Sequence, residues 1–272
     1  MVQSMQRKQI NIGLYTGKDG FMYRAKCKKV FENVWLIDDA GESTCYVVMG
    51  KEKGMVIDTA NGAENLQEVI RTLTDLPLVV ANTHGHGDHI QGNYFFDEMW
   101  IHPADEALAQ DHYGWMREEM EKAGLKPGQF RFLAIGQKFD LGGTVLEVVD
   151  LKGHTAGSVG FLDRNNRVLF SGDGVIPTPW MQLDHSLPIA TLRDTLINLK
   201  ANYGGDFDYV LFGHAQGLVG TELVDQLLNG CKELLAGQRD RDTAYQYFDG
   251  ECLFHPCDEE GKVGIVYTED KL

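Results

Sequence analysis

The sequence has little of what would direct the chain to a membrane or to nucleic acid. Its apolar runs are all far shorter than the ~18 residues that a membrane-spanning helix needs. Residues 1–20 contain no apolar stretch of the kind that forms the core of a secretory signal peptide. Cationic residues are also scarce, because 25 Lys and Arg stand against 40 Asp and Glu, which gives a formal net charge of −15. Such a charge repels phosphate backbones and anionic lipid heads, so neither a nucleic-acid partner nor a membrane partner is expected.

Cysteine is too rare for a disulfide framework. The five cysteines are an odd number in a chain of 272 residues, which indicates reduced thiols and favours a cytoplasmic protein. Cys252, His255 and Cys257 form a C-L-F-H-P-C segment that weakly resembles a small metal site. No fourth ligand is evident, so a structural role is favoured for these three residues.

Apolar residues make up 43% of the sequence, which is enough for a sizeable core, and they fall into two strand-rich halves. Short β-branched and aromatic runs predict strands, and apolar residues three or four apart predict helices. An N-x-x-E pattern at Asn61 and Glu64 resembles a capping box. Strands are expected at 33–38, 44–49, 54–58, 77–81, 138–141, 144–149, 158–162, 167–170, 209–212 and 263–267, and helices at about 66–73, from Pro188 and at 223–235. This order suggests two sheets face to face with helices outside, although periodicity alone does not show one four-layer sandwich.

The most informative segment is T-H-G-H-G-D-H-I-Q-G at Thr83–Gly92, which follows an expected buried strand. It holds His84, His86, Asp88 and His89 within six residues. Neutral imidazole and carboxylate groups suit Zn²⁺, Fe²⁺ and Mn²⁺. Two histidines separated by one residue are able to grip one ion from a turn, and the next two ligands then face a second ion. The glycines between them allow a sharp bend.

Three more potential ligands follow expected strands, each next to a turn of small residues. His154 lies in G-H-T-A-G-S, Asp173 in S-G-D-G and His214 in L-F-G-H. Each one alone is more typical of an ordinary loop, whereas four such sites in one chain favour a metal centre.

In this order, H-x-H-x-D-H, G-H-T-x-G-S, S-G-D and G-H resemble the metallo-β-lactamase superfamily, over roughly residues 30–220. The resemblance implies one αββα four-layer sandwich over residues 1–272, with the site between the sheets. A helical lid is expected near 104–124 and a C-terminal extension from about 221. The resemblance assigns the first metal to His84, His86 and His154, the second to Asp88, His89 and His214, and a bridge to Asp173. A Cys or Ser is typical at the Asp173 position of true β-lactamases, so the pattern is closer to the glyoxalase II-like and lactonase-like branches. The short region after Gly220 lacks a cationic cluster for glutathione, which argues against glyoxalase II itself.

The chemistry expected from this ligand set is hydrolysis of an ester, thioester or lactone of a small molecule by a hydroxide that bridges two divalent metals, with zinc favoured and iron or manganese as alternatives. Asp88 is the catalytic candidate, because a ligand carboxylate retains one oxygen that is able to pass a proton to the leaving group. Three alternatives remain. The first is an iron-dependent redox enzyme of the same fold, such as a sulfur dioxygenase. The others are a small-molecule phosphodiesterase and a non-catalytic protein.

Substrate contacts are expected mainly from the segment Val175–Pro188, which follows Asp173. Its candidates are Trp180, Met181, Asp184 and His185, with packing favoured equally for Trp180 and Met181 and a surface position favoured for His185. Tyr94, Phe95 and Trp115 are further candidates for which core packing is favoured. The sequence carries no signal for oligomeric state.

Overall fold

A computed structural model describes residues 13–16, 22–39, 41–62, 64–114, 116–247 and 250–272. Most of residues 1–20, on which the signal-peptide argument depends, lie outside this range, as does Trp115. No helix in the described part of the chain is long and apolar enough to cross a bilayer. The helices are α1 (Leu66–Arg71), α2 (Gly87–Ile90), α3 (Glu106–Tyr113), α4 (Arg117–Lys122), α5 (Ile189–Tyr203) and α6 (Glu222–Leu235).

The first sheet has eight strands that follow one another in chain order from β1 to β8. Its early strands pair antiparallel, whereas β5 to β8 run parallel because helical connections return the chain to the same edge. The strands are β1 (Gly13–Thr16), β2 (Met22–Phe31), β3 (Val34–Asp39), β4 (Ser43–Met49), β5 (Gly54–Ile57), β6 (Leu78–Ala81), β7 (Glu98–Ile101) and β8 (Gln129–Phe132).

The second sheet has the order β14-β13-β12-β11-β10-β9. Strand β11 is antiparallel to both of its neighbours and β13 is parallel to β12, so β10, β12 and β13 point in one direction. Their carboxyl ends therefore meet at one edge of the sheet. The strands are β9 (Lys138–Asp140), β10 (Val145–Asp150), β11 (Val159–Asp163), β12 (Val168–Gly172), β13 (Tyr209–Phe212) and β14 (Val219–Gly220).

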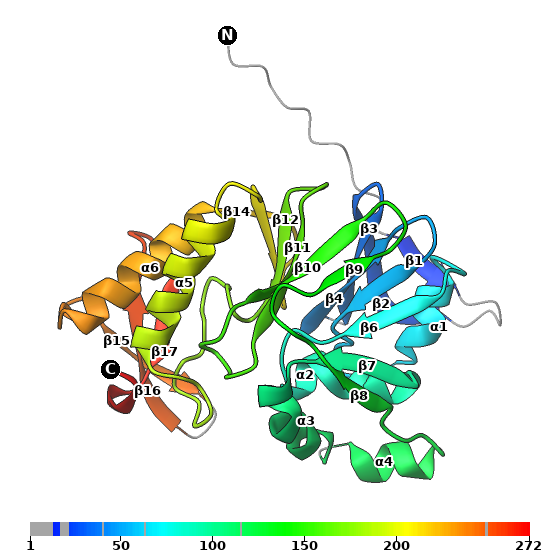
Figure 1. Ribbon diagram of the computed structural model, residues 1–272. Helices are drawn as coiled ribbons and strands as arrows, with labels where there is room; N and C mark the ends of the chain where they lie inside the picture. The colour runs from blue at the N-terminus through cyan, green and yellow to red at the C-terminus, as the bar shows by residue number, and fades with distance from the viewer. Residues whose placement is uncertain (1–12, 17–21, 40, 63, 115, 248–249) are drawn as a thin grey trace.

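The two sheets face each other across an apolar core, and helices cover their outer faces (Figure 1). Tyr46 from β4 and Phe170 from β12 meet in this core with ring centroids 5.1 Å apart. Leu66, Val69 and Ile70 of α1 pack on the outer face of the first sheet. Helices α5 and α6 pack on the outer face of the second sheet. The layers are helix, sheet, sheet and helix, which confirms the predicted αββα sandwich.

Helix α1 begins four residues later than the capping pattern at Asn61 suggested. Its N-cap is Asn65, whose side chain accepts a hydrogen bond from the Glu68 backbone N–H at 3.3 Å. The same N-x-x-E pattern occurs at both places in the sequence. Asn61 instead donates from its side chain to Glu42 at 2.8 Å, which ties two loops together.

The segment expected to form a lid forms α3 and α4, which pack with α2 below the first sheet in the view of Figure 1. Ala109, Tyr113 and Met120 are buried there in a small core of their own. The tail after α6 forms a third sheet, β15 (Thr243–Tyr247), β16 (Gly250–Pro256) and β17 (Gly264–Tyr267), of which the sequence predicted only the last strand.

Phe170→Ala should lower the free energy of unfolding by about 3–5 kcal/mol, because it leaves a cavity between the two sheets. Phe170 has no solvent-exposed surface, whereas Phe132 on β8 is 48% exposed. The matched control Phe132→Ala should change the free energy by less than about 0.5 kcal/mol. Urea unfolding of both variants, with chelator present to remove any contribution from metal, measures the difference. Equal losses would contradict this assignment of the core.

Candidate metal centre

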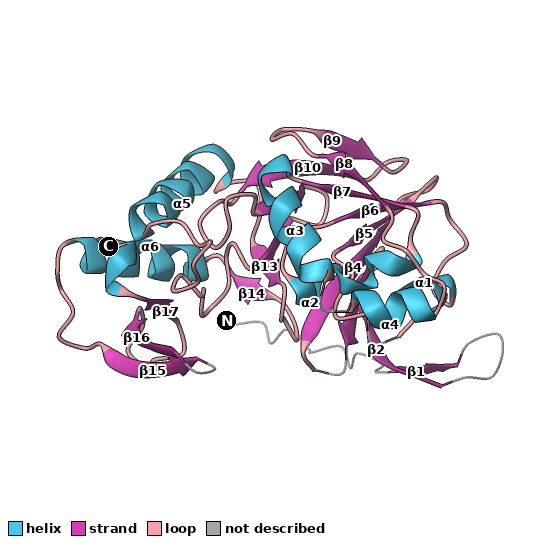
Figure 2. Cartoon of the chain, turned by 90° about the horizontal axis from the view of Figure 1, so that it is seen from below, coloured by secondary structure: helices cyan, strands magenta, loops and turns pink. Residues whose placement is uncertain are grey.

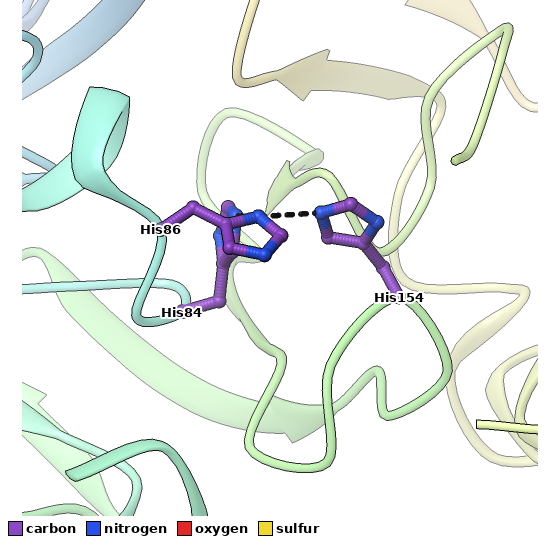
Figure 3. A group of neighbouring side chains, drawn as sticks. All are labelled: His84, His86 and His154. Atoms are coloured by element: carbon purple, nitrogen blue, oxygen red, sulfur yellow. Dashed lines mark hydrogen bonds between the residues drawn. The ribbon is translucent and has the colours of Figure 1, made fainter. Parts of the chain in front are cut away.

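Three histidines from two loops converge at the edge of the sandwich. His84 and His86 lie in the turn between β6 and α2, and His154 lies in the loop after β10. Nδ1 of His86 is 3.0 Å from Nε2 of His84 and 2.9 Å from Nε2 of His154 (Figure 3). All three residues are buried, and their ligand atoms lie within 4.8 Å of one another. This grouping is the one that the family resemblance assigns to the first metal.

A second group lies beside the first. The ligand atoms of Asp88, His89 and His214 also lie within 4.8 Å of one another. Asp88 Oδ2 is 3.5 Å from Nε2 of His89 and 3.5 Å from Nε2 of His214. Figure 1 shows that α2, which carries two of these residues, lies next to the gap between the two sheets.

Asp173, directly after β12, lies between the two groups. Its Oδ1 is 3.6 Å from Nε2 of His89, and its Oδ2 is 3.4 Å from Nε2 of His214 and 3.8 Å from Nε2 of His154. The seven residues named from the sequence therefore lie together, and Asp173 has the position that a bridging carboxylate needs. Their role as ligands stays a prediction.

Hydrogen bonds to the outward-facing nitrogens fix the orientation of the rings. In four of the five histidines Nδ1 has a protein partner, which leaves Nε2 facing the centre. The partners are Thr83 Oγ1 for His84 at 3.0 Å, Asp58 for His89 at 2.9 Å, the Trp180 carbonyl for His154 at 3.0 Å and the Glu42 carbonyl for His214 at 2.6 Å. His86 is the exception, because its Nδ1 faces the centre and its Nε2 contacts Nε2 of His185.

Asp58 was not singled out from the sequence, although it ends an expected strand. Its carboxylate accepts from the Thr83 backbone N–H at 2.7 Å and from the Thr83 hydroxyl at 2.8 Å, and it also holds His89. The backbone of Asp58 has φ of 60°, a left-handed conformation that is uncommon for a residue with a Cβ. Such strain is typical of functional sites, where surrounding contacts over-determine the conformation.

Asp105, also missed from the sequence, ties the two ligand loops together. Its buried carboxylate accepts from the Gly85 N–H at 2.9 Å, the Gly157 N–H at 2.7 Å and the Thr155 hydroxyl at 2.6 Å. Gly85 is required here for packing, because a Cβ would come within 2.9 Å of the Asp105 carbonyl oxygen. The glycine therefore allows close approach of the α3 region rather than of a metal.

Two buried atoms at the centre lack a hydrogen-bond partner among the described residues, namely Nε2 of His89 and Oδ1 of Asp173. Buried polar atoms are almost always paired, so these two atoms fit a site that completes its contacts with metal ions. Gly213 leaves the space that they need, because a Cβ there would lie 2.3 Å from Cε1 of His89 and 2.5 Å from Oδ1 of Asp173.

The histidines of the two groups differ in the direction in which their pKa values are shifted. Burial and neighbouring histidines hold the pKa of His84 and His86 well below the usual value, so these rings are neutral at pH 7. Burial alone would also lower the pKa of His89, but nearby carboxylates, Asp88 foremost, outweigh it and raise that pKa. The pKa of Asp173 is well below its usual value, because His89 and His214 overcome the effect of burial. The site thus offers the neutral imidazoles of His84 and His86 together with the ionised carboxylate of Asp173, a combination that suits a hydrolytic metal centre.

The centre opens into a cavity of about 1130 Å³. Of the predicted substrate contacts, Trp180 and His185 line this cavity. Met181 and Tyr94 do not, since Met181 is fully buried in the core beneath α5 and α6, and Tyr94 packs on Tyr113 and donates to its carbonyl at 3.1 Å. The packing that the sequence favoured for Tyr94 is thus the observed one.

His112, from the segment expected to be a lid, also lines the cavity, and its ring stacks on that of His86 with centroids 5.4 Å apart.

The C-L-F-H-P-C segment does not form a cluster of metal ligands. Cys252 and His255 point to opposite faces of β16, and His255 is buried between Asp242 and Glu233. All five cysteines are free thiols.

Comparison with known proteins agrees with this geometry. The family model described as the metallo-beta-lactamase superfamily matches residues 38–248, which include all seven residues of the centre. The chain belongs to this superfamily. Superfamily members bind divalent metals, and the residues that converge here form a possible metal site.

Named relatives within the superfamily include thioester hydrolases. Acyl-coenzyme A thioesterase MBLAC2 from Bos taurus is 32% identical over 167 residues, which cover 51% of this chain and 60% of that protein, less than two thirds of its length. The Gallus gallus protein of that name is 25% identical and covers 80% of this chain and 82% of that protein. Hydroxyacylglutathione hydrolase GloC from Haemophilus influenzae is 30% identical over 180 residues, which cover 59% of this chain and 82% of that protein. These relatives support a metallo-hydrolase of the superfamily.

Solved structures show the same fold. A metallo-beta-lactamase from Pontibacter korlensis superimposes with a TM-score of 0.61 at 20% identity, over 76% of this chain and 99% of that chain. A metallo-beta-lactamase family protein from Thermus thermophilus superimposes with a TM-score of 0.55 at 19% identity, over 78% of this chain and 81% of that chain. At these identities the likeness concerns the fold alone.

Asp105→Ala should destabilise the protein by about 2–5 kcal/mol, because it leaves buried N–H groups of both ligand loops unpaired. Asp105→Asn should lose less stability, since the amide oxygen of asparagine still accepts hydrogen bonds from these N–H groups. The matched control is Asp111→Ala, at an exposed acidic residue on the following helix. Guanidinium unfolding gives the stability, and elemental analysis after dialysis gives the retained metal. A stability for Asp105→Ala equal to that of the control would show that this carboxylate does not hold the loops.

Proposed function

We propose that the protein is a dinuclear metal-dependent hydrolase that cleaves an ester, thioester or lactone of a small molecule. The observation that supports this most directly is the pair of three-residue groups with Asp173 between them, at the base of a cavity. Among the three bond types, the thioester is favoured, since the named relatives are thioester hydrolases.

In this proposal His84, His86 and His154 hold one divalent ion, Asp88, His89 and His214 hold the other, and Asp173 holds both. Zinc is the favoured metal, because imidazole and carboxylate groups form its usual hydrolytic sites. Two such ions would polarise a carbonyl group and make hydroxide available near neutral pH. The side chains of the protein position the acyl carbon and transfer protons.

Asp88 is the residue to move the proton. Its side chain lines the cavity and is 37% exposed, whereas the three histidines of the first group are buried. Its Oδ2 is 3.5 Å from Nε2 of both histidines, and the other oxygen would be the one offered to the substrate. An oxygen in this place is able to accept a proton from the attacking water and to return it to the leaving sulfur or oxygen.

Asp88→Asn should lower kcat by about two orders of magnitude or more, because an amide keeps the size of the carboxylate but does not carry the proton. The metal should be at least partly retained, which elemental analysis checks alongside kcat. The candidate Asp184 is exposed and does not line the cavity, so Asp184→Asn is the matched control. Near-normal turnover of the Asp88 variant would remove this residue from the proposed role.

Removal and return of metal test the dinuclear centre itself. Dialysis against a chelator should abolish thioester hydrolysis, and activity should rise with added Zn²⁺ until about two ions are bound per chain. Elemental analysis and a panel of thioesters, lactones and phosphodiesters provide the measurement. Activity that saturates at one ion would contradict the dinuclear proposal. Iron as the native metal, with oxygen uptake on a thiol substrate, would replace hydrolysis by a redox function.

A further inference from the structure

One face of the C-terminal sheet forms a wall of the cavity. Residues alternate between the two faces of a strand, so Thr243, Tyr245 and Tyr247 of β15 point the same way. Phe254 of β16 lies opposite Thr243 in the register and points with them. All four line the cavity. We call Tyr245, Tyr247 and Phe254 the aromatic wall.

The opposite face of this sheet fixes the wall in place. Leu253, Ile265 and Tyr267 pack into the core that α6 shares with the second sheet. His255 on the same face bridges Asp242 of the loop before β15 and Glu233 of α6. Figure 2 shows the C-terminal sheet lying alongside α6. The wall is thus the exposed side of a sheet that is anchored from behind.

The wall is connected to the metal centre through the loop after Asp173. β17 exchanges hydrogen bonds with this loop, since the Met181 N–H donates to the Val266 carbonyl at 2.7 Å and the Val266 N–H donates to the Pro179 carbonyl at 3.1 Å. Between these two loop residues, the Trp180 carbonyl accepts from His154, and the Trp180 ring meets the Tyr247 ring at 4.5 Å and 72°. Trp180 therefore contacts both His154 of the metal centre and Tyr247 of the aromatic wall.

The chemistry of the cavity lining is apolar and aromatic away from the metal centre. Ile176, Trp180 and Leu183 lie on the loop side, and Tyr245 and Phe254 are stacked at 6.3 Å on the sheet side. Among the described residues that line the cavity there is no Lys or Arg. Aromatic side chains bind apolar groups by burying large areas, whereas phosphate and carboxylate groups are bound by cationic side chains.

We propose that the aromatic wall binds the uncharged, apolar acyl group of the substrate, while the leaving thiol receives no cationic partner from the described residues of the cavity. This inference rests on the proposed hydrolase function and names its substrate class. Hydrolysis forms one C–O bond from water to the acyl carbon and breaks the C–S bond. One proton of the water leaves with the acid and the other goes to the leaving sulfur.

The wall spans the end of the shared family region. The family match ends at residue 248, so Tyr245 and Tyr247 lie within it, whereas Phe254 and the whole of β17 lie beyond it. The metal centre belongs entirely to the matched region, whereas Phe254 and the strand that ties the wall to the loop after Asp173 do not.

Acetyl and hexanoyl thioesters of N-acetylcysteamine, which is neutral, test the proposal with the metal-loaded protein. The hexanoyl ester should have the higher kcat/KM, and Phe254→Ala and Tyr245→Ala should each lower the hexanoyl-to-acetyl ratio by about tenfold, since the wall contacts only the longer chain. Phe254→Leu, which keeps an apolar side chain, should restore most of the ratio. Phe132→Ala, at an exposed aromatic residue on β8, is the matched control.

The same hexanoyl group on coenzyme A tests the leaving thiol. Its kcat/KM should not exceed that of the neutral thioester, and its KM should not rise with added NaCl. A ratio of hexanoyl to acetyl that is the same in all variants would overturn the wall while leaving the hydrolase intact. A preference for the coenzyme A thioester that is lost in salt would overturn the uncharged class. Failure to hydrolyse any thioester would overturn the proposed function itself.

Discussion

Two buried carboxylates hold the geometry on which the rest of the site depends. Asp58 fixes Thr83 and His89, and Asp105 fixes Gly85 at one end and the Thr155–Gly157 turn at the other. A metal centre assembled from loops requires those loops to be positioned before the ions arrive. Each carboxylate accepts several hydrogen bonds, so its burial is compensated by the groups that it organises.

The metal centre and the aromatic wall come from different parts of the chain. The strand ends of two sheets supply the metal-centre residues, and their spacing follows from strand direction and register. The third sheet is added after α6 and reaches the same cavity from its far side. The sequences of loops and terminal additions vary more easily than metal ligands do. Differences in substrate between relatives are therefore expected at such a wall.

Much of the fold and of the site was predictable, because their signals are local. His84, His86, Asp88 and His89 occur in one short turn, and the other ligands each follow a recognisable strand. Asp58 and Asp105 were missed for the opposite reason, since each acts on groups at least 20 positions away and a lone Asp at the end of a strand or in a turn has no pattern of its own.

The prediction of substrate contacts was partly wrong because the sequence does not show in which direction each side chain points. Trp180 and Met181 are neighbours in sequence, yet the first lines the cavity and the second is buried in the core, because consecutive residues along an extended segment point to opposite sides. β15 and β16 were overlooked because their alternation mixes aromatic with polar residues. Only the cavity shows which side these aromatic residues face.

Gly213 shows how closely the centre constrains the chain that surrounds it. Even the methyl group of alanine would enter the space between His89 and Asp173. Any side chain at position 213 would therefore push His89 or Asp173 out of the place from which they face each other, although Gly213 itself binds nothing. The shape of the centre thus depends on a residue that contributes no atom to it.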